Sequence, residues 1–521
     1  MISALEGTST TSPQARLEAA RVCSKQMTLQ ELLDGVDVLE CLGDLSIPVQ
    51  RICLDSRKVV PGSIFFAISG HQTDGNLFIN EALERGACAI VTSSPNNQSG
   101  YTRVLVEDTR SALAQISRKF FHYPDTDLRV LGVTGTNGKT SVTMLVRHLL
   151  EGKDGATKTA LLGTIHNNLG GKIIPSRRTT AEAHELYELL DISRSAGCER
   201  AIMEVSSHGV EQKRIEGMDF KTSAFLNLTP EHLDYHHSME HYYQAKKRFV
   251  CGEGSATAPE HAVINIDDFY GQRLLSELPN GIKPVTFGES EMADFRANDI
   301  VCDSAGTQFN LQYPGGTTFV RSPLLGRFNV HNLLTALAIG WIEGKSLQEM
   351  ISKLDSFSGV PGRLERIQVG QDFNVIVDYA HTDDALENIL SVLREVTVGR
   401  LLLVYGCGGD RDQDKRPAMT QTAQKYCDFV WATADNPRSE PLSSIFKHME
   451  AGVTKPEAIS FVRDRRRAIG LAIGEAKVRD CLVIAGKGHE TYQEYSSTVI
   501  PFDDRLVAQD LIKLRLSSPE T

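Results

Sequence analysis

Residues 128–141 constrain this chain more than any other stretch. An apolar run ends in the glycine-rich sequence Gly135-Thr136-Asn137-Gly138, and Lys139-Thr140-Ser141 then opens a run with apolar residues at helical spacing. This order of strand, turn and helix predicts a phosphate-binding loop, because glycine lets backbone N–H groups approach phosphate oxygens without a Cβ clash. Lys139 would reach the β- and γ-phosphates, and the Thr140 hydroxyl would ligate Mg²⁺.

One position departs from the strict phosphate-loop pattern. The pattern has glycine five residues before Gly138, but Val133 stands there and Gly132 lies one residue earlier. A glycine-rich turn alone is often only a turn. It is the flanking strand, the Lys-Thr pair and the helix that together predict nucleotide binding.

Length and composition limit the class of protein. A chain of 521 residues exceeds what one hydrophobic core supports and suggests about three domains. The net charge of −11 argues against a nucleic-acid partner, and the ten cysteines include no Cys-x-x-Cys pair that would indicate zinc or a disulfide framework. No apolar run approaches the roughly 20 residues that a membrane helix needs. We therefore expect a cytoplasmic α/β protein with no membrane partner. A monomer is expected, although the sequence itself does not report the oligomeric state.

Composition shifts along the chain predict the domain boundaries. Residues 1–27 are expected to be a disordered extension, with Met27 as an alternative start. An α/β domain is predicted over 28–124, a central P-loop ATPase-like domain with a parallel sheet over 125–357, and a Rossmann-like C-terminal domain over 358–521. Tyr123-Pro124-Asp125 is interpreted as a linker, and the Gly/Pro-rich segment 358–363 as a hinge.

The first domain contains two polar turns, at 54–57 and 70–75, beside a predicted buried strand at 64–68. Such residues are ordinary turn-formers. The alternative is that their hydroxyl, amide and imidazole groups line a pocket for a polar ligand.

The central domain places a carboxylate near the phosphate loop. A predicted strand at 201–205 carries Glu204 close to its end, where α/β sheets hold their ligands, so Glu204 is a candidate Mg²⁺ ligand. The segment His232-Leu-Asp-Tyr-His236 looks metal-binding, but histidines without a matching Cys or acid pattern favour a structural role. Lys246 lies on a predicted helix whose charged face would ordinarily be only solvated.

Polar clusters follow each of four predicted C-terminal strands, at 374–377, 400–405, 429–433 and 481–485. The carboxyl ends of parallel strands meet at one edge of a sheet, so these clusters are expected to line one ligand crevice. They comprise Asp378 to His381, residues 406–411, Asp435 to Arg438, and Gly486 to Glu490.

The order of these motifs resembles that of the Mur ligase family over residues 28–514. The resemblance rests on Asp55-Ser56-Arg57, the phosphate loop, Glu204-Val-Ser-Ser-His-Gly209, His232–His236, Asp378-Tyr-Ala-His381 and Asp435-Asn436-Pro437-Arg438. It implies an N-terminal domain that grips the UDP end of a UDP-N-acetylmuramoyl-dipeptide, a central ATPase, and a C-terminal domain that brings the incoming amino acid. The implied reaction forms an amide through an acyl phosphate, with ATP and Mg²⁺. The Asp-Asn-Pro-Arg motif resembles the version that adds meso-diaminopimelate.

The resemblance also implies roles for individual residues. Catalysis would use Lys139, Glu204, His232, Lys246, Arg363 and Asp378. ATP would contact residues 135–141 and Asn329. Metal ligands would be Thr140, Glu204, His232 and Lys246, the last as a carbamate. Uridine diphosphate would contact Leu54, Ser56, His71, Gln72 and Thr73, and the muramoyl-dipeptide Thr179, Thr180, Ser206, Gln212 and Arg214. Arg411 and Arg438 would hold the amino acid's carboxylates beside Pro437, and Asp435, Asn436, Gly486 and Glu490 its ammonium.

Several alternatives stay open from the sequence. A lysine-adding sibling would share nearly every motif, and folylpolyglutamate synthase would lack the UDP-binding domain. A P-loop kinase or NTPase would use the third domain for regulation, and a non-catalytic nucleotide-binding module would not need Lys139, Glu204 and Lys246. Asp383 stands where relatives usually have proline, so a local loop change is expected there.

Overall fold

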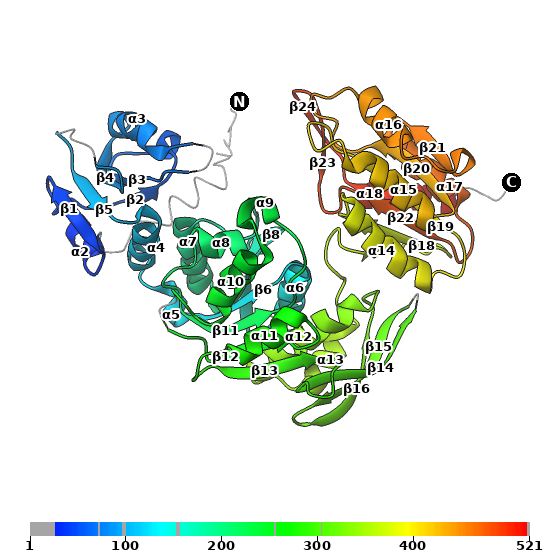
Figure 1. Ribbon diagram of the computed structural model, residues 1–521, viewed down its shortest axis with the longest axis horizontal. Coiled ribbons are helices and arrows are strands. Elements are labelled where there is room, and N and C mark those ends of the chain that lie inside the picture. The colour runs from blue at the N-terminus through cyan, green and yellow to red at the C-terminus, as the bar shows by residue number, and fades with distance from the viewer. Residues whose placement is uncertain are drawn as a thin grey trace, which may run out of the picture. The chain divides into compact units, whose positions relative to one another are not determined.

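The computed structural model of the chain describes residues 27–70, 73–95, 100–152, 157–254, 257–303 and 305–517 (Figure 1). The expected extension at 1–26 lies outside these residues. Two compact units are present. The first is the chain up to Pro124 together with Glu182–Glu188 and Gln212–Gly217, and the second holds Asp125–Ala181, Leu189–Glu211 and the chain from Met218 onward.

The first unit is built on a five-stranded sheet in the order β1-β5-β4-β3-β2. Only β1 (Val38–Leu42) is antiparallel to its neighbour; β5 (Arg103–Val106), β4 (Ala87–Thr92), β3 (Ser63–Ala67) and β2 (Arg51–Cys53) are parallel. Ile64 and Phe66 of β3 pack in a core with α2 (Leu29–Leu33) and α4 (Thr109–Phe120), whereas Phe65 packs toward α3 (Ile79–Glu84). This alternation confirms the buried strand predicted at 64–68.

The second unit contains an eleven-stranded sheet in the order β16-β15-β14-β13-β12-β11-β6-β10-β7-β8-β9. Neighbours from β14 through to β7 pair in parallel, and both ends of the sheet continue as antiparallel strands. The strands are β6 (Arg129–Thr134), β7 (Lys158–Leu162), β8 (His166–Asn168), β9 (Ile173–Pro175), β10 (Cys198–Glu204), β11 (Phe220–Phe225), β12 (His261–Asn265), β13 (Lys283–Gly288), β14 (Phe295–Asp303), β15 (Gly306–Tyr313) and β16 (Gly316–Ser322).

Helices cover both faces of this sheet. They are α6 (Lys139–Leu150), α7 (Ala183–Ser195), α8 (Ser207–Glu211), α9 (Leu233–His236), α10 (Met239–Val250), α11 (Phe269–Ser276), α12 (Phe328–Ile342) and α13 (Leu347–Leu354). Leu131 and Val133 of β6 pack in the core shared with α6 and α12. A Cβ at Gly132 would lie 2.5 Å from the Phe249 ring of α10 and 2.9 Å from the Phe220 ring. Gly132 is therefore a packing glycine of the strand, not a displaced member of the phosphate loop.

The segment interpreted as a linker at 123–125 does lie at the boundary between the two units, which falls after Pro124, but it is not an irregular connection. Residues Pro124–Asp127 form the one-turn helix α5, and Asp125 is fully buried, with its carboxylate accepting a hydrogen bond from the Asp219 backbone N–H at 2.8 Å. Proline at the first helical position favours this turn. The buried carboxylate anchors the start of the second unit.

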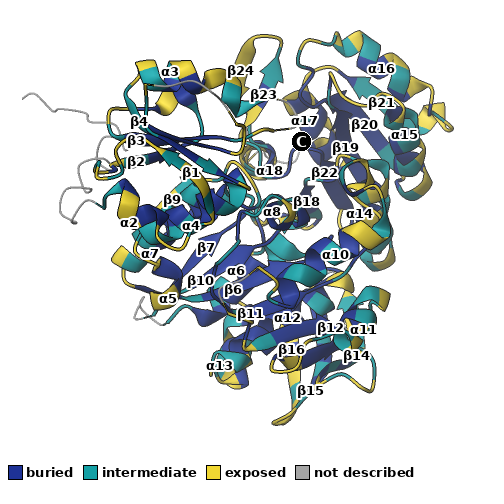
Figure 2. Cartoon of the chain, turned by 60° about the vertical axis from the view of Figure 1, so that its left-hand side comes forward, coloured by how far each residue is buried: buried dark blue, intermediate teal, exposed yellow. Residues whose placement is uncertain are grey.

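A second sheet of this unit has six strands in the order β17-β18-β22-β19-β20-β21. The parallel strands are β18 (Asn374–Asp378), β22 (Cys481–Ala485), β19 (Leu401–Cys407), β20 (Phe429–Ala434) and β21 (Ile459–Val462), and β17 (Glu365–Arg366) is antiparallel. The first four confirm the four predicted strands, and β21 was not predicted. Leu401 and Leu403 face α14 (Asp383–Val396), α15 (Lys415–Tyr426) and α16 (Leu442–Glu450), while Leu402 and Val404 face α17 (Arg465–Glu475) and α18 (Asp504–Ser517). Strands covered on both faces are buried throughout (Figure 2).

Two local features complete the C-terminal module. A hairpin of β23 (Tyr492–Tyr495) and β24 (Thr498–Pro501) forms a separate two-stranded sheet. Asp383 is the first residue of α14, whose N-cap is Thr382. Both proline and an acidic residue suit that position, so the expected loop change is not needed. In the described part of the chain, no helix is long and apolar enough to cross a membrane.

Candidate nucleotide and amino-acid sites

The phosphate loop forms as predicted between β6 and α6. Gly138 has φ +90°, and a Cβ there would lie 2.5 Å from Asn332 Oδ1, so this position requires glycine. The Lys139 ammonium folds back over the loop, donating to the carbonyls of Gly135 and Thr136 at 2.8 Å each. Burial lowers the pKa of Lys139, and the carboxylates of Glu204 and Glu231 oppose that effect. A partly buried ammonium that donates to two carbonyls in this way suits a phosphate.

Glu204 ends β10 beside this loop and is almost fully buried. Its Oε2 accepts hydrogen bonds from the hydroxyls of Thr140 at 2.9 Å and Thr164 at 3.0 Å, and its Oε1 accepts one from the Thr164 N–H at 2.7 Å. The structure thus brings together two predicted metal ligands. Thr164 was missed, although its place just after the strand β7 was a usable signal.

Lys246 is buried on α10 and donates to the Gly135 carbonyl at 2.9 Å. Its ammonium also lies 4.6 Å from the centre of the Tyr242 ring. Burial, reinforced by the charge of Lys139, lowers the pKa of Lys246 well below its usual range. The ordinary alternative of a solvated helix face does not hold for Lys246, because its side chain is buried and points into the loop.

His232 lies in a cluster of rings and is about half exposed. Its ring centre is 4.9 Å from that of His208, and a neighbouring histidine, His236, stacks on Tyr242 at 4.9 Å. His236 is buried and shares a hydrogen bond of 2.8 Å with the Ser207 hydroxyl. His236 has the predicted structural role, while His232 remains open to a ligand.

The residues expected to hold the muramoyl-dipeptide fall in both units. The Thr180 hydroxyl donates to the Glu204 carbonyl at 2.9 Å and accepts from the Ser206 N–H at 2.9 Å, so Thr180 and Ser206 are tied to the end of β10. Thr179 lies 3.1 Å from the Thr164 hydroxyl. In the first unit, Arg214 donates to the Gln212 side chain and pairs with Glu182.

The expected uridine-diphosphate contacts belong to the first unit. Ser56 is buried and its hydroxyl donates to Glu81 at 2.7 Å, so that hydroxyl is already engaged. Leu54 is half-buried and Thr73 exposed. His71 and Gln72 lie outside the described residues.

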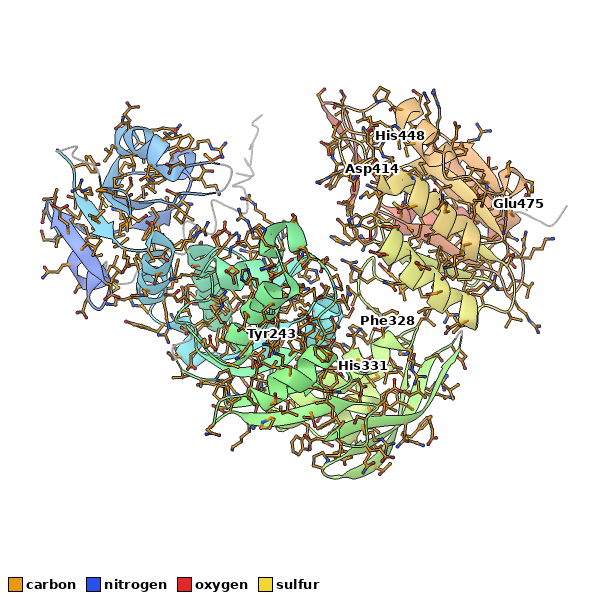
Figure 3. All side chains as sticks on the ribbon, viewed as in Figure 1. Tyr243, Phe328, His331, Asp414, His448 and Glu475 are labelled. Atoms are coloured by element: carbon orange, nitrogen blue, oxygen red, sulfur yellow. The ribbon has the colours of Figure 1, made fainter. Side chains whose placement is uncertain are left out.

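Asn329 and its surroundings were also expected to contact ATP. Asn329 is buried in the first turn of α12, where its side chain donates to the Leu325 carbonyl and accepts from Asn332. Nearby, the ligand atoms of Asp267, Glu289 and His331 lie within 4.8 Å of one another (His331 is labelled in Figure 3). His331 pairs with Asp267 and Arg327 pairs with Glu289, so this cluster is internally satisfied and no cation is assigned to it.

The polar clusters of the C-terminal module lie where its parallel strands end, as the sequence predicted. Asp378 ends β18, and its carboxylate accepts the N–H groups of Leu364 at 2.7 Å and Ala380 at 2.8 Å. Burial raises the pKa of Asp378, against the effect of these N–H groups. The Gly486 N–H donates to the Asp378 carbonyl at 3.1 Å, and the exposed Arg363 guanidinium lies 4.8 Å from the Tyr379 ring centre.

The segment from Asp435 to Arg438 follows β20. Asn436 Oδ1 accepts from Lys487 Nζ and from the Glu494 N–H, both at 3.0 Å, and Asn436 Nδ2 donates to Glu490 at 2.9 Å. Both lone pairs of that amide oxygen are used. Asn436 is therefore unsuited to accept an ammonium, and Asp435, the Gly486 carbonyl and Glu490 are the remaining predicted acceptors. Lys487, fully buried and 2.8 Å from Glu490, was missed by the sequence analysis.

The two predicted carboxylate-binding arginines lie on neighbouring loops. Arg438 Nη1 donates to the Gly409 carbonyl at 2.8 Å, and Arg411 is exposed on the same loop as Gly409. Pro437 accepts from the Glu440 N–H at 3.1 Å. A Cβ at Gly408 would lie 3.2 Å from Arg438 Nη1 and 3.7 Å from Arg411 Cγ, so both side chains pass close to that glycine.

These features define an α/β protein with a phosphate loop, a buried carboxylate beside it, and a separate Rossmann-like module with cationic loops. Three family models match the chain: "Mur ligase family, catalytic domain" over residues 48–121, "Mur ligase middle domain" over 133–340, and "Mur ligase, glutamate ligase domain" over 362–488.

Relatives match over nearly the whole chain. The UDP-N-acetylmuramoyl-L-alanyl-D-glutamate–2,6-diaminopimelate ligase of Caldanaerobacter subterraneus subsp. tengcongensis is 39% identical over 93% of this chain and 99% of its own. A solved structure with the same ligase name is 33% identical, with a TM-score of 0.70, over 95% of this chain and 100% of that one. A solved structure of folylpolyglutamate synthase of Mycobacterium tuberculosis shares the fold. It is 18% identical, with a TM-score of 0.57, over 79% of this chain and 96% of that one. The chain belongs to the Mur ligase family and is an ATP-dependent ligase.

Proposed function

We propose that this ligase joins meso-diaminopimelate to UDP-N-acetylmuramoyl-L-alanyl-D-glutamate in peptidoglycan precursor synthesis. The relatives that match it over nearly their full length carry that activity in their names. The observation that carries the choice of amino acid is the pair of arginines beside Gly408. Diaminopimelate has two carboxylates, and Arg411 and Arg438 offer a cation for each.

The central sheet supplies the activating step. ATP would lie on the loop 135–141, with Lys139 against its phosphates, and the D-glutamyl carboxylate would attack the γ-phosphate to give an acyl phosphate and ADP. The amine of diaminopimelate then attacks that carbonyl, and phosphate leaves. Positioning and charge neutralisation dominate such a transfer, because two anions must approach each other.

The residues present fit Mg²⁺, which prefers oxygen ligands. The Thr140 hydroxyl and the Glu204 carboxylate are 2.9 Å apart, and Glu204 has hydrogen-bond donors but no cation within ion-pair distance among the described residues. Mg²⁺ would supply charge neutralisation at the phosphates, with His232 near a second position.

Lys246 fits the same site only after modification. A bare ammonium would oppose a metal ion, but burial lowers the pKa of Lys246 and so favours the neutral amine, the form that can react with CO₂. The carbamate formed has the charge of a carboxylate and would be a metal ligand. Arg363 and Asp378 are proposed to contact ATP from the C-terminal module.

Product analysis tests the proposal. Purified protein is incubated with ATP, Mg²⁺ and the UDP-linked dipeptide, with diaminopimelate and L-lysine in separate reactions, and ADP and product masses are followed. Diaminopimelate tripeptide with matching ADP supports the proposal. A lysine tripeptide alone would identify a lysine-adding ligase, and ADP without any amide product would favour a P-loop NTPase.

A further inference from the structure

The hairpin β23–β24 lies against the segment from Asp435 to Arg438 and contacts it along its length. The Gln493 side chain is buried and donates to the carbonyls of Asp435 at 2.9 Å and Ala434 at 3.4 Å. The next residue, Glu494, donates its N–H to Asn436 Oδ1 at 3.0 Å. One strand thus binds three consecutive residues at the end of β20.

The same strand fixes the backbone of Arg438. Arg438 has φ +51°, a conformation that a residue with a side chain rarely adopts and keeps only where its surroundings impose it. Its N–H donates to the Glu494 carbonyl at 3.0 Å, and its carbonyl accepts from the Ser496 N–H at 2.6 Å. Both hydrogen bonds come from the hairpin, so the hairpin holds this backbone conformation.

The strand also orients the Arg438 side chain. Glu494 Oε2 lies 3.2 Å from Arg438 Nε, and Arg438 Nη1 donates to the Gly409 carbonyl at 2.8 Å. These contacts lie on different parts of the guanidinium. The Nη2 N–H groups take part in neither contact and are available to an incoming carboxylate, and the side chain is about one quarter exposed.

We propose that β23 is the positioning element for Arg438 and that Glu494 is a specificity-determining residue acting through it. The inference rests on the proposed function, in which Arg438 binds a carboxylate of diaminopimelate. A guanidinium held at Nε presents its remaining N–H groups in a fixed direction, so less side-chain freedom is lost when the carboxylate binds. L-Lysine has no second carboxylate and gains nothing from this orientation.

The variant Glu494→Gln tests the inference with little change in shape. Glu494 is one third exposed, and an ion pair of this kind contributes little to stability, so the variant is expected to fold. We expect the KM for diaminopimelate to rise about tenfold, the scale set by one immobilised side chain, while kcat and the KM values for ATP and the UDP-linked dipeptide stay unchanged. The matched control is Glu475→Gln, an exposed residue at the end of α17, on the side of the C-terminal module away from β23 (Figures 1 and 3). It should leave every constant unchanged.

A double-mutant cycle checks that Glu494 acts through Arg438. In an Arg438→Ala background, Glu494→Gln should raise the KM for diaminopimelate no further. Additive effects would overturn the inference, as would an unchanged or lower KM in the single variant. A wild type that makes no diaminopimelate product defeats the proposed function itself. If the wild type is active and Glu494→Gln has the same kcat and KM values, only this inference is defeated.

Discussion

Burial decides the chemistry of the two lysines at the phosphate loop. Lys139 and Lys246 both bond the Gly135 carbonyl, and burial lowers the pKa of each, but the shift is large only at Lys246. Lys139 has the opposing charges of Glu204 and Glu231 close by. The surroundings of Lys139 therefore favour the charged form more than those of Lys246 do, which suits Lys139 to phosphate and Lys246 to modification.

The variant Lys246→Ala should lose most of the ligase activity, because the carbamate that would serve as a metal ligand cannot form. Adding a short carboxylic acid should restore part of it by filling the space left by the side chain. Activity is measured as ADP release with and without the acid. Near-wild-type activity of the variant without any additive would show that Lys246 is not needed as a ligand.

The role of Thr164 in orienting Glu204 is a prediction that comes from the structure and not from the sequence. Its hydroxyl lies 3.0 Å from Glu204 Oε2, so Thr164→Val removes a donor that orients the carboxylate, while the backbone bond stays. We expect the Mg²⁺ concentration for half-maximal ADP release to rise about tenfold, as for other partners of metal ligands. Thr164→Ser keeps the hydroxyl and is the control. If Thr164→Val and Thr164→Ser depended equally on Mg²⁺ concentration for ADP release, the proposed role of this hydroxyl would be refuted.

At the scale of elements, packing between a strand and a helix explains why residue 132 is glycine, which the phosphate-loop pattern does not explain. The β6 strand passes so close to α10 that there is no room for a side chain at position 132. Gly132→Ala should destabilise the protein by about 1–3 kcal/mol through overpacking. Gly474→Ala, on α17 with no atom within 4 Å of the added Cβ, is the control and should be neutral or stabilising. Urea unfolding compares them, and a stability for Gly132→Ala equal to that of the wild type would contradict this account.

The ion pair of Arg416 and Glu440 links α15 to the loops that carry Arg411 and Arg438. Arg416 is fully buried, pairs with Glu440 at 2.7 Å, and donates to the Gly408 carbonyl at 3.0 Å. Its hydrogen bonds lower the pKa of Glu440 to about 2. Because the folded-state pKa lies below the ordinary value of 4.5, the pair's stabilisation is complete above pH 4.5 and is lost as the pH falls toward 2.

Glu440→Gln should therefore cost on the order of 3 kcal/mol at pH 7, since it leaves a buried guanidinium without its counter-ion. The difference in free energy of unfolding between the variant and the wild type should become smaller as the pH falls from about 4.5 toward about 2, where Glu440 itself becomes neutral. Glu387→Gln removes an exposed pair with Lys425 and should have almost no effect at any pH. Urea unfolding across this pH range is the measurement, and a pH-independent difference would contradict the assignment.

At the scale of the whole molecule, local sequence patterns predicted the helices and strands better than they predicted the contacts between them. The phosphate loop, the strand ending at Glu204 and the four C-terminal strands follow from periodicity and turn residues, and the structure confirms them. The burial of Lys246, the helix at Pro124–Asp127 and the contacts of Lys487 depend on packing partners far away in sequence. The hairpin β23–β24 was missed for the same reason, because the segment Tyr492–Tyr495 has no motif of its own.

We propose that this ligase selects diaminopimelate through its C-terminal loops. The most direct test offers wild-type protein equimolar meso-diaminopimelate and L-lysine in one reaction with ATP, Mg²⁺ and the UDP-linked dipeptide, and weighs the products. A site built around Arg438 could discriminate by on the order of 10⁴, so we predict the diaminopimelate tripeptide with no detectable lysine product. Comparable amounts of both tripeptides would show that the C-terminal loops do not select diaminopimelate over lysine.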